Sequence, residues 1–263
     1  CPGTNADVER PMNFSLAGKR TLVTGASRGI GRAIALAFAD SGADVAVMAR
    51  NEELLNEVAD EIQRRGRKAV VCVADALDED ALRAGIEHGI AGLGGLDTLV
   101  NNAGGNSFSI PVATMRMSGW EKTLRLNLHS VVQATQAALP AIMESRGSII
   151  NVSSVVALRG APTMSHYGAA KAALVSFTQS LALETAWAGV RVNALLPGWI
   201  DTDLTDFLRV SEEAEAGTLS RVPMQRWGTP DEIAGPAVFL ASSAAQFMTG
   251  QSMVVDGGLS AMP

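Results

Sequence analysis

The sequence predicts an α/β fold in which helices cover both faces of a doubly wound, seven-stranded parallel sheet. Seven short, near-continuously apolar runs recur along its 263 residues, as strands buried on both faces require. Stretches with helical spacing of apolar residues separate these runs, and strict alternation of strand and helix implies right-handed crossovers between parallel strands. With 47% hydrophobic and 18% charged residues, the chain is expected to bury one core, so we predict a single domain over residues 12–263.

The predicted strands are runs of four to seven residues in which β-branched and apolar side chains dominate. In chain order they cover residues 20–24, 44–48, 68–74, 96–100, 148–152, 190–194 and 252–255. The amphipathic stretches between them predict helices over residues 32–41, 52–64, 80–91, 120–143, 168–186 and 231–241. Pro140 has no backbone N–H to donate, so it should kink or end the helix that contains it.

Two segments depart from this alternation. Residues 198–229 contain acidic side chains but no strand pattern, and an insertion of this length predicts a lid over a binding cleft. Residues 1–11 are polar and unpatterned, and we expect a disordered or extended N-terminal extension there.

Composition argues against several classes of partner. The net charge is −6 and the 21 lysines and arginines form no block, so neither nucleic acid nor an anionic membrane is expected to bind. No apolar run reaches the roughly 18 to 20 residues that span a bilayer, and the N-terminus lacks the pattern of a signal peptide. Cys72 lies within an apolar run and is expected to be a buried free thiol, which suits a cytoplasmic protein.

A glycine-rich turn follows the first predicted strand, where residues 24–31 read Thr-Gly-Ala-Ser-Arg-Gly-Ile-Gly. Glycines permit a tight turn and let the backbone approach a pyrophosphate, whose charge is favoured by the free N–H groups at a helix start. The spacing differs from the common Gly-x-Gly-x-x-Gly fingerprint, but the first strand-to-helix turn of such a sheet lies at its ligand crevice. The candidate dinucleotide-binding residues here are Gly25, Ser27, Arg28, Gly29, Ile30 and Gly31.

The end of the second strand bears on which dinucleotide binds. An acid there would bind the 2′-hydroxyl of NAD, whereas a base would bind the 2′-phosphate of NADP. Arg50 follows this strand and could share that phosphate with Arg28, so NADP(H) is favoured over NAD(H). Arg50 could instead be an ordinary charge at a helix start. Asp75, with Ala76 beside it, closes the third strand and could accept from the adenine amine or cap a helix.

Two further strand ends are expected to contact the nicotinamide half of the cofactor. After the fourth strand, small residues could let the backbone lie close to the nicotinamide ribose, or they could simply form a turn. The candidates there are Asn102, Ala103 and Gly104. The chain after the sixth strand would pass the carboxamide, and Thr202 is the residue most able to bond it. The candidates there are Pro197, Gly198, Ile200 and Thr202.

The only tyrosine, Tyr167, lies four residues before Lys171, which puts both side chains on one face of a helix. An adjacent ammonium favours the phenolate and lowers a pKa that starts near ~10 toward the working range of a general acid or base. Ser154, which follows a separate strand, could bind the carbonyl oxygen that Tyr167 protonates. Asn127 stands between two leucines, where a buried amide needs partners, so it is either a structural hydrogen-bonding residue or the holder of a relay water.

In this order, these residues resemble those of the short-chain dehydrogenase/reductase family over residues 16–259. The shared features are residues 24–31, Asp75, residues 101–104, Asn127, Ser154, Tyr167, Lys171, and residues 197–198, 249–251 and 256–258. The resemblance implies a Rossmann-type fold and an NAD(P)-dependent oxidoreductase that transfers a hydride between the nicotinamide and a carbonyl or secondary alcohol.

The resemblance also implies roles for four catalytic residues, two of which would contact the cofactor as well. Tyr167 would be the general acid or base and Ser154 would orient the carbonyl. Lys171 would bind ribose hydroxyls and lower the tyrosine pKa, and Asn127 would hold a relay water. Family members are commonly tetramers, so a homotetramer is implied, with contacts through the two long helices and the last strand.

Within the family the sequence looks similar to 3-oxoacyl carrier-protein reductases and to tropinone- or glucose-dehydrogenase-like members. Members that take acyl carrier protein often carry an arginine on each of two long helices, and the matching positions here are Gln133 and Leu183. Together with the acidic net charge, this favours a reductase of free ketones or secondary alcohols. The alternative is a 3-oxoacyl-[acyl carrier protein] reductase, and a second alternative is a catalytically silent NADPH-sensing protein.

The remaining candidates concern the small-molecule substrate and a metal. The expected substrate walls are apolar: Val155, Met164, Trp199, Phe207 and Leu208. Three aspartates, Asp201, Asp203 and Asp206, cluster in the predicted lid, but no histidine stands at ligand spacing with them, so no metal site is predicted. His166 should point away from the catalytic face and is interpreted as structural.

Overall fold

The computed structural model describes residues 14–209 and 211–262, so the predicted extension at residues 1–11 lies outside the described residues. Within these ranges, seven strands form one sheet in the order β3-β2-β1-β4-β5-β6-β7. They are β1 (Arg20–Thr24), β2 (Asp44–Ala49), β3 (Ala69–Val73), β4 (Thr98–Asn101), β5 (Ser148–Val152), β6 (Arg191–Pro197) and β7 (Ser252–Val255). Every neighbouring pair is parallel, which confirms the predicted sheet.

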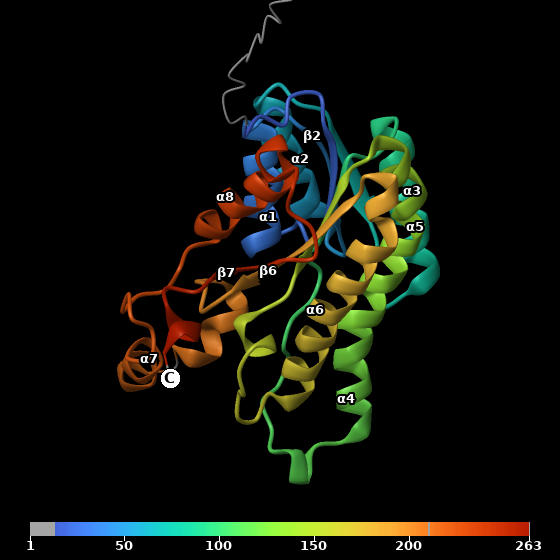
Figure 1. Cartoon of the computed structure of the whole chain (residues 1–263). Coiled ribbons are helices and arrows are strands. Elements are labelled where there is room, and N and C mark those ends of the chain that lie inside the picture. The colour runs from blue at the N-terminus through green and yellow to red at the C-terminus, as the bar shows by residue number, and fades with distance from the viewer. Residues whose placement is uncertain (1–13, 210, 263) are drawn as a thin grey trace, which may run out of the picture.

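Helices cover both faces of this sheet (Figure 1). One layer contains α1 (Gly29–Asp40), α2 (Glu52–Arg64) and α8 (Pro230–Ala241), and the other contains α3 (Glu79–Leu93), α5 (Ser130–Ser145) and α6 (Ser165–Thr185). Each layer buries its own apolar core against the sheet, for example around Ile34 and Phe38 in the first and around Ile86 and Ile142 in the second. The two cores explain why the strands are apolar on both faces.

The order of the strands reverses between β1 and β4. From β1 the chain winds outward through β2 to β3, then returns to place β4 on the other side of β1 before it winds out to β7. In open α/β sheets, ligands bind in the crevice outside the carboxyl ends of the strands at such a reversal. Thr24 ends β1 and Asn101 ends β4, so the glycine-rich turn and the segment after the fourth strand meet at this crevice.

The helix predicted over residues 120–143 differs from the observed structure. It comprises α4 (Met117–Leu124), a π-helical turn η2 (Arg125–His129) and α5, which continues past Pro140 to Ser145. Pro140 therefore does not end the helix; it lies on the exposed side, where water can satisfy the carbonyl left without a partner one turn earlier. Helix α1 begins at Gly29 rather than at residue 32, because the glycine-rich turn itself forms its first turn.

The described part of residues 198–229, which we call the lid segment, holds no strand apart from an isolated bridge between Ile200 and Gly228. It contains the 3-10 helix η5 (Asp203–Leu208) and the helix α7 (Glu212–Leu219). Arg209 links its parts, because its guanidinium donates to Asp201 at 2.5 Å and lies 4.4 Å from the centroid of the Trp227 ring. These contacts join the two ends of the segment.

Shorter 3-10 turns complete the described chain: η1 (Val112–Thr114), η3 (Val155–Ala157), η4 (Ala186–Ala188), η6 (Ser243–Ala245) and η7 (Leu259–Ala261). Among the helices of residues 14–209 and 211–262, none combines the length and the apolar character that crossing a membrane requires.

Candidate active site

The glycine-rich turn forms a cradle at the start of α1. Gly25 and Gly29 have φ angles of 66° and 54°, in a region that L side chains rarely adopt. A Cβ on Gly31 would lie 2.2 Å from the Gly25 carbonyl oxygen, so only glycine fits there. Arg28 occupies the N-cap position without a side-chain cap, which leaves the first N–H groups of α1 to a ligand. This cradle fits the pyrophosphate of a dinucleotide.

Thr24 joins this cradle to the end of β4, a role that the sequence pattern did not predict. Its Oγ1 accepts from the backbone N–H groups of Asn102 and Ala103, both at 3.0 Å. The Asn102 side-chain amide donates to the carbonyls of Thr24 and Gly25, at 3.0 and 3.2 Å. The candidate cofactor residues of these two strands therefore form one connected unit. A hydroxyl at the end of a strand that precedes a glycine-rich turn is the signal that could have identified Thr24.

Asn127 lies in the π-helical turn η2 and is fully buried. Its Nδ2 donates to the carbonyls of Gly105 and Thr123, at 2.9 and 3.0 Å, and its Oδ1 accepts from the Gly105 N–H at 2.9 Å. The chain thus uses both amide protons, which supports the structural interpretation of this residue. Turns of this π type are frequent at functional sites, and this one holds the segment that follows β4.

Tyr167, Lys171 and Ser154 come together as predicted. On α6, the Lys171 Nζ lies 5.6 Å from the centroid of the Tyr167 ring, and both side chains are buried. Ser154 follows β5, and its side chain lies near the Tyr167 hydroxyl, where hydrogen bonding favours the phenolate. The Lys171 ammonium donates to the Val152 carbonyl at 2.9 Å, and a Cβ on Gly104 would lie 3.3 Å from it. Gly104, which has no side chain and follows β4, therefore lies next to the Lys171 ammonium.

Burial dominates the proton affinities of this group. It raises the pKa of Tyr167 to about 12, although the hydrogen bond with Ser154 opposes the rise. It lowers the pKa of Lys171 to about 8, because the ammonium loses its water. In the chain alone the net shift is thus opposite to the predicted lowering, because burial outweighs any stabilisation of the phenolate by the ammonium. At 5.6 Å from the ring and bound to the Val152 carbonyl, the ammonium does not offset the cost of burying a phenolate.

The two arginines predicted to bind a 2′-phosphate lie on exposed parts of the structure. Arg28 pairs with Asp203 of the lid segment at 2.6 Å, and Arg50 pairs with Asp75 at 3.9 Å. All four side chains are exposed. Each guanidinium therefore already has an acidic partner, which a phosphate would have to displace.

Asp75 does not cap the helix that follows it. Its Oδ1 accepts from the Leu77 N–H at 2.9 Å, whereas Asp78 caps α3 by accepting from the Ala81 N–H. The cap alternative is wrong because α3 starts only at Glu79, beyond the reach of Asp75. Asp75 and Ala76 remain at the end of β3, where a contact with adenine stays a prediction.

The lid segment lies against both candidate cofactor loops. The predicted contacts after the sixth strand are the end of β6 and the first lid residues: Pro197, Gly198, Ile200 and Thr202. A Cβ added to Gly29 would lie 3.3 Å from the Thr202 methyl group. A Cβ added to Gly105 would lie 3.3 Å from the Leu204 Cδ1. The segment therefore packs on the glycine cradle and on the chain after β4, while the bond from Thr202 to a carboxamide stays a prediction.

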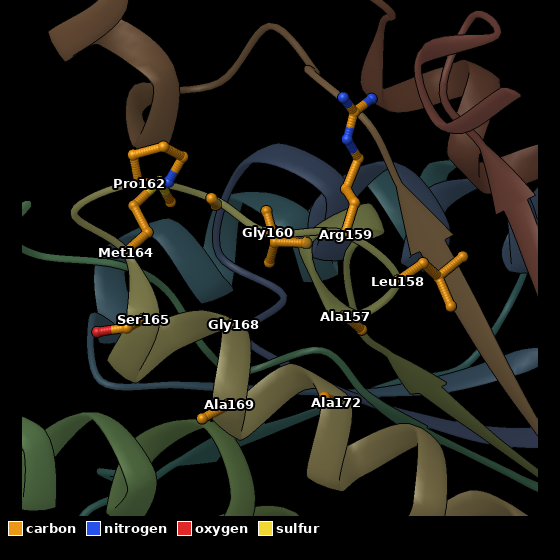
Figure 2. A pocket seen from close by; sticks show the side chains of 12 residues that line it. Ala157, Leu158, Arg159, Gly160, Pro162, Met164, Ser165, Gly168, Ala169 and Ala172 are labelled. Atoms are coloured by element: carbon orange, nitrogen blue, oxygen red, sulfur yellow. The ribbon is translucent and has the colours of Figure 1, made fainter. Parts of the chain in front are cut away.

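A surface cavity of about 710 Å³ lies between α6 and the loop before it (Figure 2). Its α6 wall consists of Ser165, Gly168, Ala169 and Ala172, on a face of the helix turned away from Tyr167 and Lys171. This cavity is therefore separate from the reacting groups. Of the predicted substrate walls Met164 lines it, whereas Val155 is buried, Trp199 and Leu208 are half-buried, and the Phe207 side chain lies outside the described part.

The described residues contain no group of three or more His, Cys, Asp or Glu side chains that could hold a metal ion. Two of the three lid aspartates pair with arginines instead, Asp201 with Arg209 and Asp203 with Arg28. His166 is fully buried and contacts Asn106 and Phe108, two residues that the sequence pattern did not single out.

Known proteins match this chain over most of its length. The family model described as Enoyl-(Acyl carrier protein) reductase matches residues 25–260. A 3-oxoacyl-[acyl-carrier-protein] reductase of Chlamydia muridarum is 39% identical over 94% of this chain and 100% of its own length.

Two solved structures are similar as well. A gluconate 5-dehydrogenase from Burkholderia cenocepacia, in complex with NADP and tartrate, has a TM-score of 0.90 at 35% identity and covers 95% of this chain and 98% of its own. A 7α-hydroxysteroid dehydrogenase complexed with NADH and 7-oxo glycochenodeoxycholic acid has a TM-score of 0.89 at 35% identity, covering 94% and 96% of the two chains. Nicotinamide dinucleotides with and without the 2′-phosphate thus occur among the similar structures.

Proposed function

This chain belongs to the short-chain dehydrogenase/reductase family of NAD(P)-dependent oxidoreductases that act on CH–OH groups, and we propose that it interconverts free ketones and secondary alcohols with NADP(H). The observation that carries this proposal is the burial of Tyr167 and Lys171, with the half-buried Ser154 hydroxyl near the phenol and Gly104 beside the ammonium. A phenol, a hydroxyl and an ammonium that converge in a dry site can deliver a proton to a carbonyl oxygen and stabilise the charge that remains.

The steps follow from the states of these side chains. A nicotinamide held by the glycine cradle and the chain after β4 would supply the hydride for the carbonyl carbon. Ser154 donates a hydrogen bond to the carbonyl oxygen, and Tyr167 transfers its phenolic proton to that oxygen, so the carbonyl becomes an alcohol. Because the pKa of Tyr167 is raised to about 12, the proton is in place at neutral pH, and an alkoxide is a strong enough base to take it. The Lys171 ammonium then stabilises the phenolate, and oxidation of an alcohol reverses these steps.

The choice of NADP(H) rests on Arg28 and Arg50. No acid occupies the end of β2, where the 2′-hydroxyl of NAD would need an acceptor, and Arg50 follows it directly. A phosphate is a better partner for a guanidinium than a single exposed carboxylate, because it offers more oxygens and more charge for bidentate pairing. We propose that the 2′-phosphate replaces Asp203 as the ion-pair partner of Arg28 and replaces Asp75 as the partner of Arg50.

A 3-oxoacyl-[acyl-carrier-protein] reductase is the second candidate, since the relative from Chlamydia muridarum carries that name. Gln133 and Leu183 stand at the positions proposed to meet an acidic carrier protein, and Leu183 is uncharged and 81% exposed. Neither position carries a cation, which favours small free substrates. The complete set of Asn127, Ser154, Tyr167 and Lys171 argues against a catalytically silent NADPH sensor.

The test is cofactor oxidation by the purified protein, with NADPH and NADH in parallel, against free ketones, diketones and a 3-oxoacyl thioester. We expect NADPH to be consumed with ketones. Tyr167→Phe should reduce turnover by roughly 10²- to 10⁴-fold, the usual contribution of a general acid, while the Kd for NADPH changes less than about twofold. Preference for the thioester would establish the second candidate, and full turnover by Tyr167→Phe would refute its role as proton donor. NADPH binding without turnover of any carbonyl would favour the sensor.

We also propose that the enzyme is a homotetramer in the cytoplasm and that residues 12–263 form its one domain. In support, Leu183 near the end of α6 and Trp187 in η4, which follows it, are 81% and 79% exposed, an apolar surface that a subunit contact would cover. Cys72 is a buried free thiol whose pKa burial raises to about 12, as suits a reducing compartment. Light scattering during size-exclusion chromatography measures the number of subunits.

A further inference from the structure

His166 directly precedes Tyr167 on α6 and is fully buried. Its Nε2 lies 3.0 Å from the Asn106 Oδ1, and its ring stacks on that of Phe108 with 4.1 Å between centroids and 4° between planes. Both partners belong to the chain that leaves β4, 60 residues earlier in the case of Asn106. The imidazole therefore joins the catalytic helix to that chain by a hydrogen bond and a parallel stack.

The segment that His166 contacts, residues 105–110, we call the site loop. Its first residue, Gly105, exchanges hydrogen bonds with the Asn127 amide, and its last, Ile110, donates its N–H to the Thr163 carbonyl at 2.8 Å. Phe108 also packs against α4, since a Cβ on Gly119 would lie 3.0 Å from its ring. Both ends of the site loop are thus held by other groups, and its middle is held by His166 and, at Phe108, also by α4.

The site loop starts at the reacting groups. Gly104, the residue before it, borders the Lys171 ammonium, where a Cβ would come within 3.3 Å of Nζ. Leu204 of the lid segment lies 3.3 Å from the Cβ position of Gly105. The site loop therefore starts beside the Lys171 ammonium and lies against the lid segment, so displacement of the loop changes the surroundings of the proposed catalytic residues.

The imidazole is neutral in this arrangement. The Asn106 oxygen accepts, so Nε2 carries the proton, and within the described residues the buried Nδ1 has no hydrogen-bond partner. A second proton on the ring would place a charge away from water. Burial accordingly lowers the pKa of His166, although an interaction with the Phe108 backbone raises it in part.

We infer that His166 is a positioning residue that fixes the site loop against the catalytic helix through Asn106 and Phe108, and thereby sets how a substrate is held before Tyr167. The inference rests on the proposed carbonyl chemistry for its effect on turnover. Its structural part, the fixation of the loop, does not depend on that chemistry. Because His166 contacts neither the glycine cradle nor the arginines, its loss leaves cofactor binding unchanged.

The experiment separates the two contacts of the imidazole. His166→Phe keeps an aromatic ring for stacking and loses the hydrogen bond, His166→Gln keeps a donor and loses the ring, and Asn106→Ala removes the acceptor. The matched control is His88→Gln, because His88 is an exposed histidine on α3. For each protein we would measure kcat and KM with the preferred ketone, the Kd for NADPH, and hydrogen exchange of a peptide covering residues 105–110 by mass spectrometry.

His166→Phe and Asn106→Ala should each lower kcat/KM about tenfold, mainly through KM, as expected for loss of one buried hydrogen bond. The Kd for NADPH should change less than about twofold and exchange in the site loop should accelerate, while His88→Gln matches the wild type. The double variant His166→Phe/Asn106→Ala should lose no more than either single variant, because both remove the same bond.

Unchanged exchange in the site loop of His166→Phe and Asn106→Ala would overturn the inference, as would additive losses or weakened NADPH binding. If the His166→Phe protein does not fold, Asn106→Ala carries the same test of the hydrogen bond, because Asn106 is only partly buried. If the wild type turns over no carbonyl, the proposed function fails, and exchange in the site loop still decides whether His166 fixes it.

Discussion

The residues proposed to perform the chemistry and those proposed to select the cofactor lie in opposite environments. Asn127, Tyr167 and Lys171 are buried, and their polar atoms are held by backbone carbonyls or by neighbouring side chains. Arg28 and Arg50 are 68% and 73% exposed and pair with exposed carboxylates. The packed core thus fixes the geometry of the proposed catalytic residues before any ligand arrives, whereas the proposed preference for NADP(H) depends on weak surface pairs that must exchange partners.

Among the tightly packed residues, Gly31 is the position where we expect a substitution to have the largest effect. A Cβ there would lie 2.2 Å from the Gly25 carbonyl oxygen and 2.4 Å from the Asn102 Nδ2, and neither can move without breaking the contact between β1 and β4. Gly31→Ala should therefore lower the free energy of unfolding by about 3 kcal/mol and weaken NADPH and NADH binding alike. Urea unfolding and titrations of cofactor fluorescence measure the two effects.

Gly217→Ala is the matched control, because Gly217 also lies inside a helix, α7, and a Cβ there meets nothing within 4 Å. This variant should gain roughly 0.5 to 1 kcal/mol from the better helix propensity of alanine. A Gly31→Ala protein as stable as Gly217→Ala would contradict a rigid cradle.

The buried charge of Lys171 gives a second test. Burial lowers its pKa from 10.5 to about 8, so between these pH values the unfolded chain keeps a proton that the folded chain has released. Stability therefore rises with pH across this window, and the destabilisation is complete below its lower end. Relative to a Lys171→Met variant, whose own offset does not depend on pH, the wild type should gain about 3 kcal/mol of unfolding free energy between pH 8 and 10.5.

Urea unfolding of both proteins at several pH values in this window measures the difference. The comparison cancels the titration of Cys72, whose pKa burial raises to about 12 and which both proteins share. A difference that stays flat up to pH 10 would mean that Lys171 keeps its charge and that its surroundings are wetter than the packed core implies.

Structural features that depend on the spacing of apolar residues could be predicted from the sequence, whereas features that depend on tertiary contacts could not. The strands and main helices follow from periodicity, and Tyr167 and Lys171 share a face because they stand four residues apart. The π-helical turn at Asn127 shifts backbone hydrogen bonds without changing the side-chain pattern, so no spacing predicts it. The raised pKa of Tyr167 depends on burial by distant elements, and His166 meets a residue 60 positions away.

On the exposed side of the comparison, Arg50→Ala should weaken NADPH binding by roughly 10- to 100-fold, the usual worth of a hydrogen bond to a charged group. NADH has no 2′-phosphate, so its Kd should change less than about threefold. Arg64→Ala is the control, because it removes the same charge from the exposed surface of α2. Equal losses for the two cofactors would show that Arg50 acts on a part that they share.

The smallest effect is expected at Asp203, whose carboxylate holds Arg28 at 2.6 Å although both side chains are about two-thirds exposed. Asp203→Asn removes a competitor for Arg28 and a like charge near the incoming phosphate, so NADPH should bind up to about fivefold more tightly, the limit for an exposed ion pair. NADH binding should not change, and the gain should vanish in 0.5 M salt because screening weakens exposed pairs. Asp206→Asn removes the same charge from the lid segment without touching Arg28, so a gain of equal size in that variant would mean that the general field of the segment, and not the pair with Arg28, opposes the phosphate.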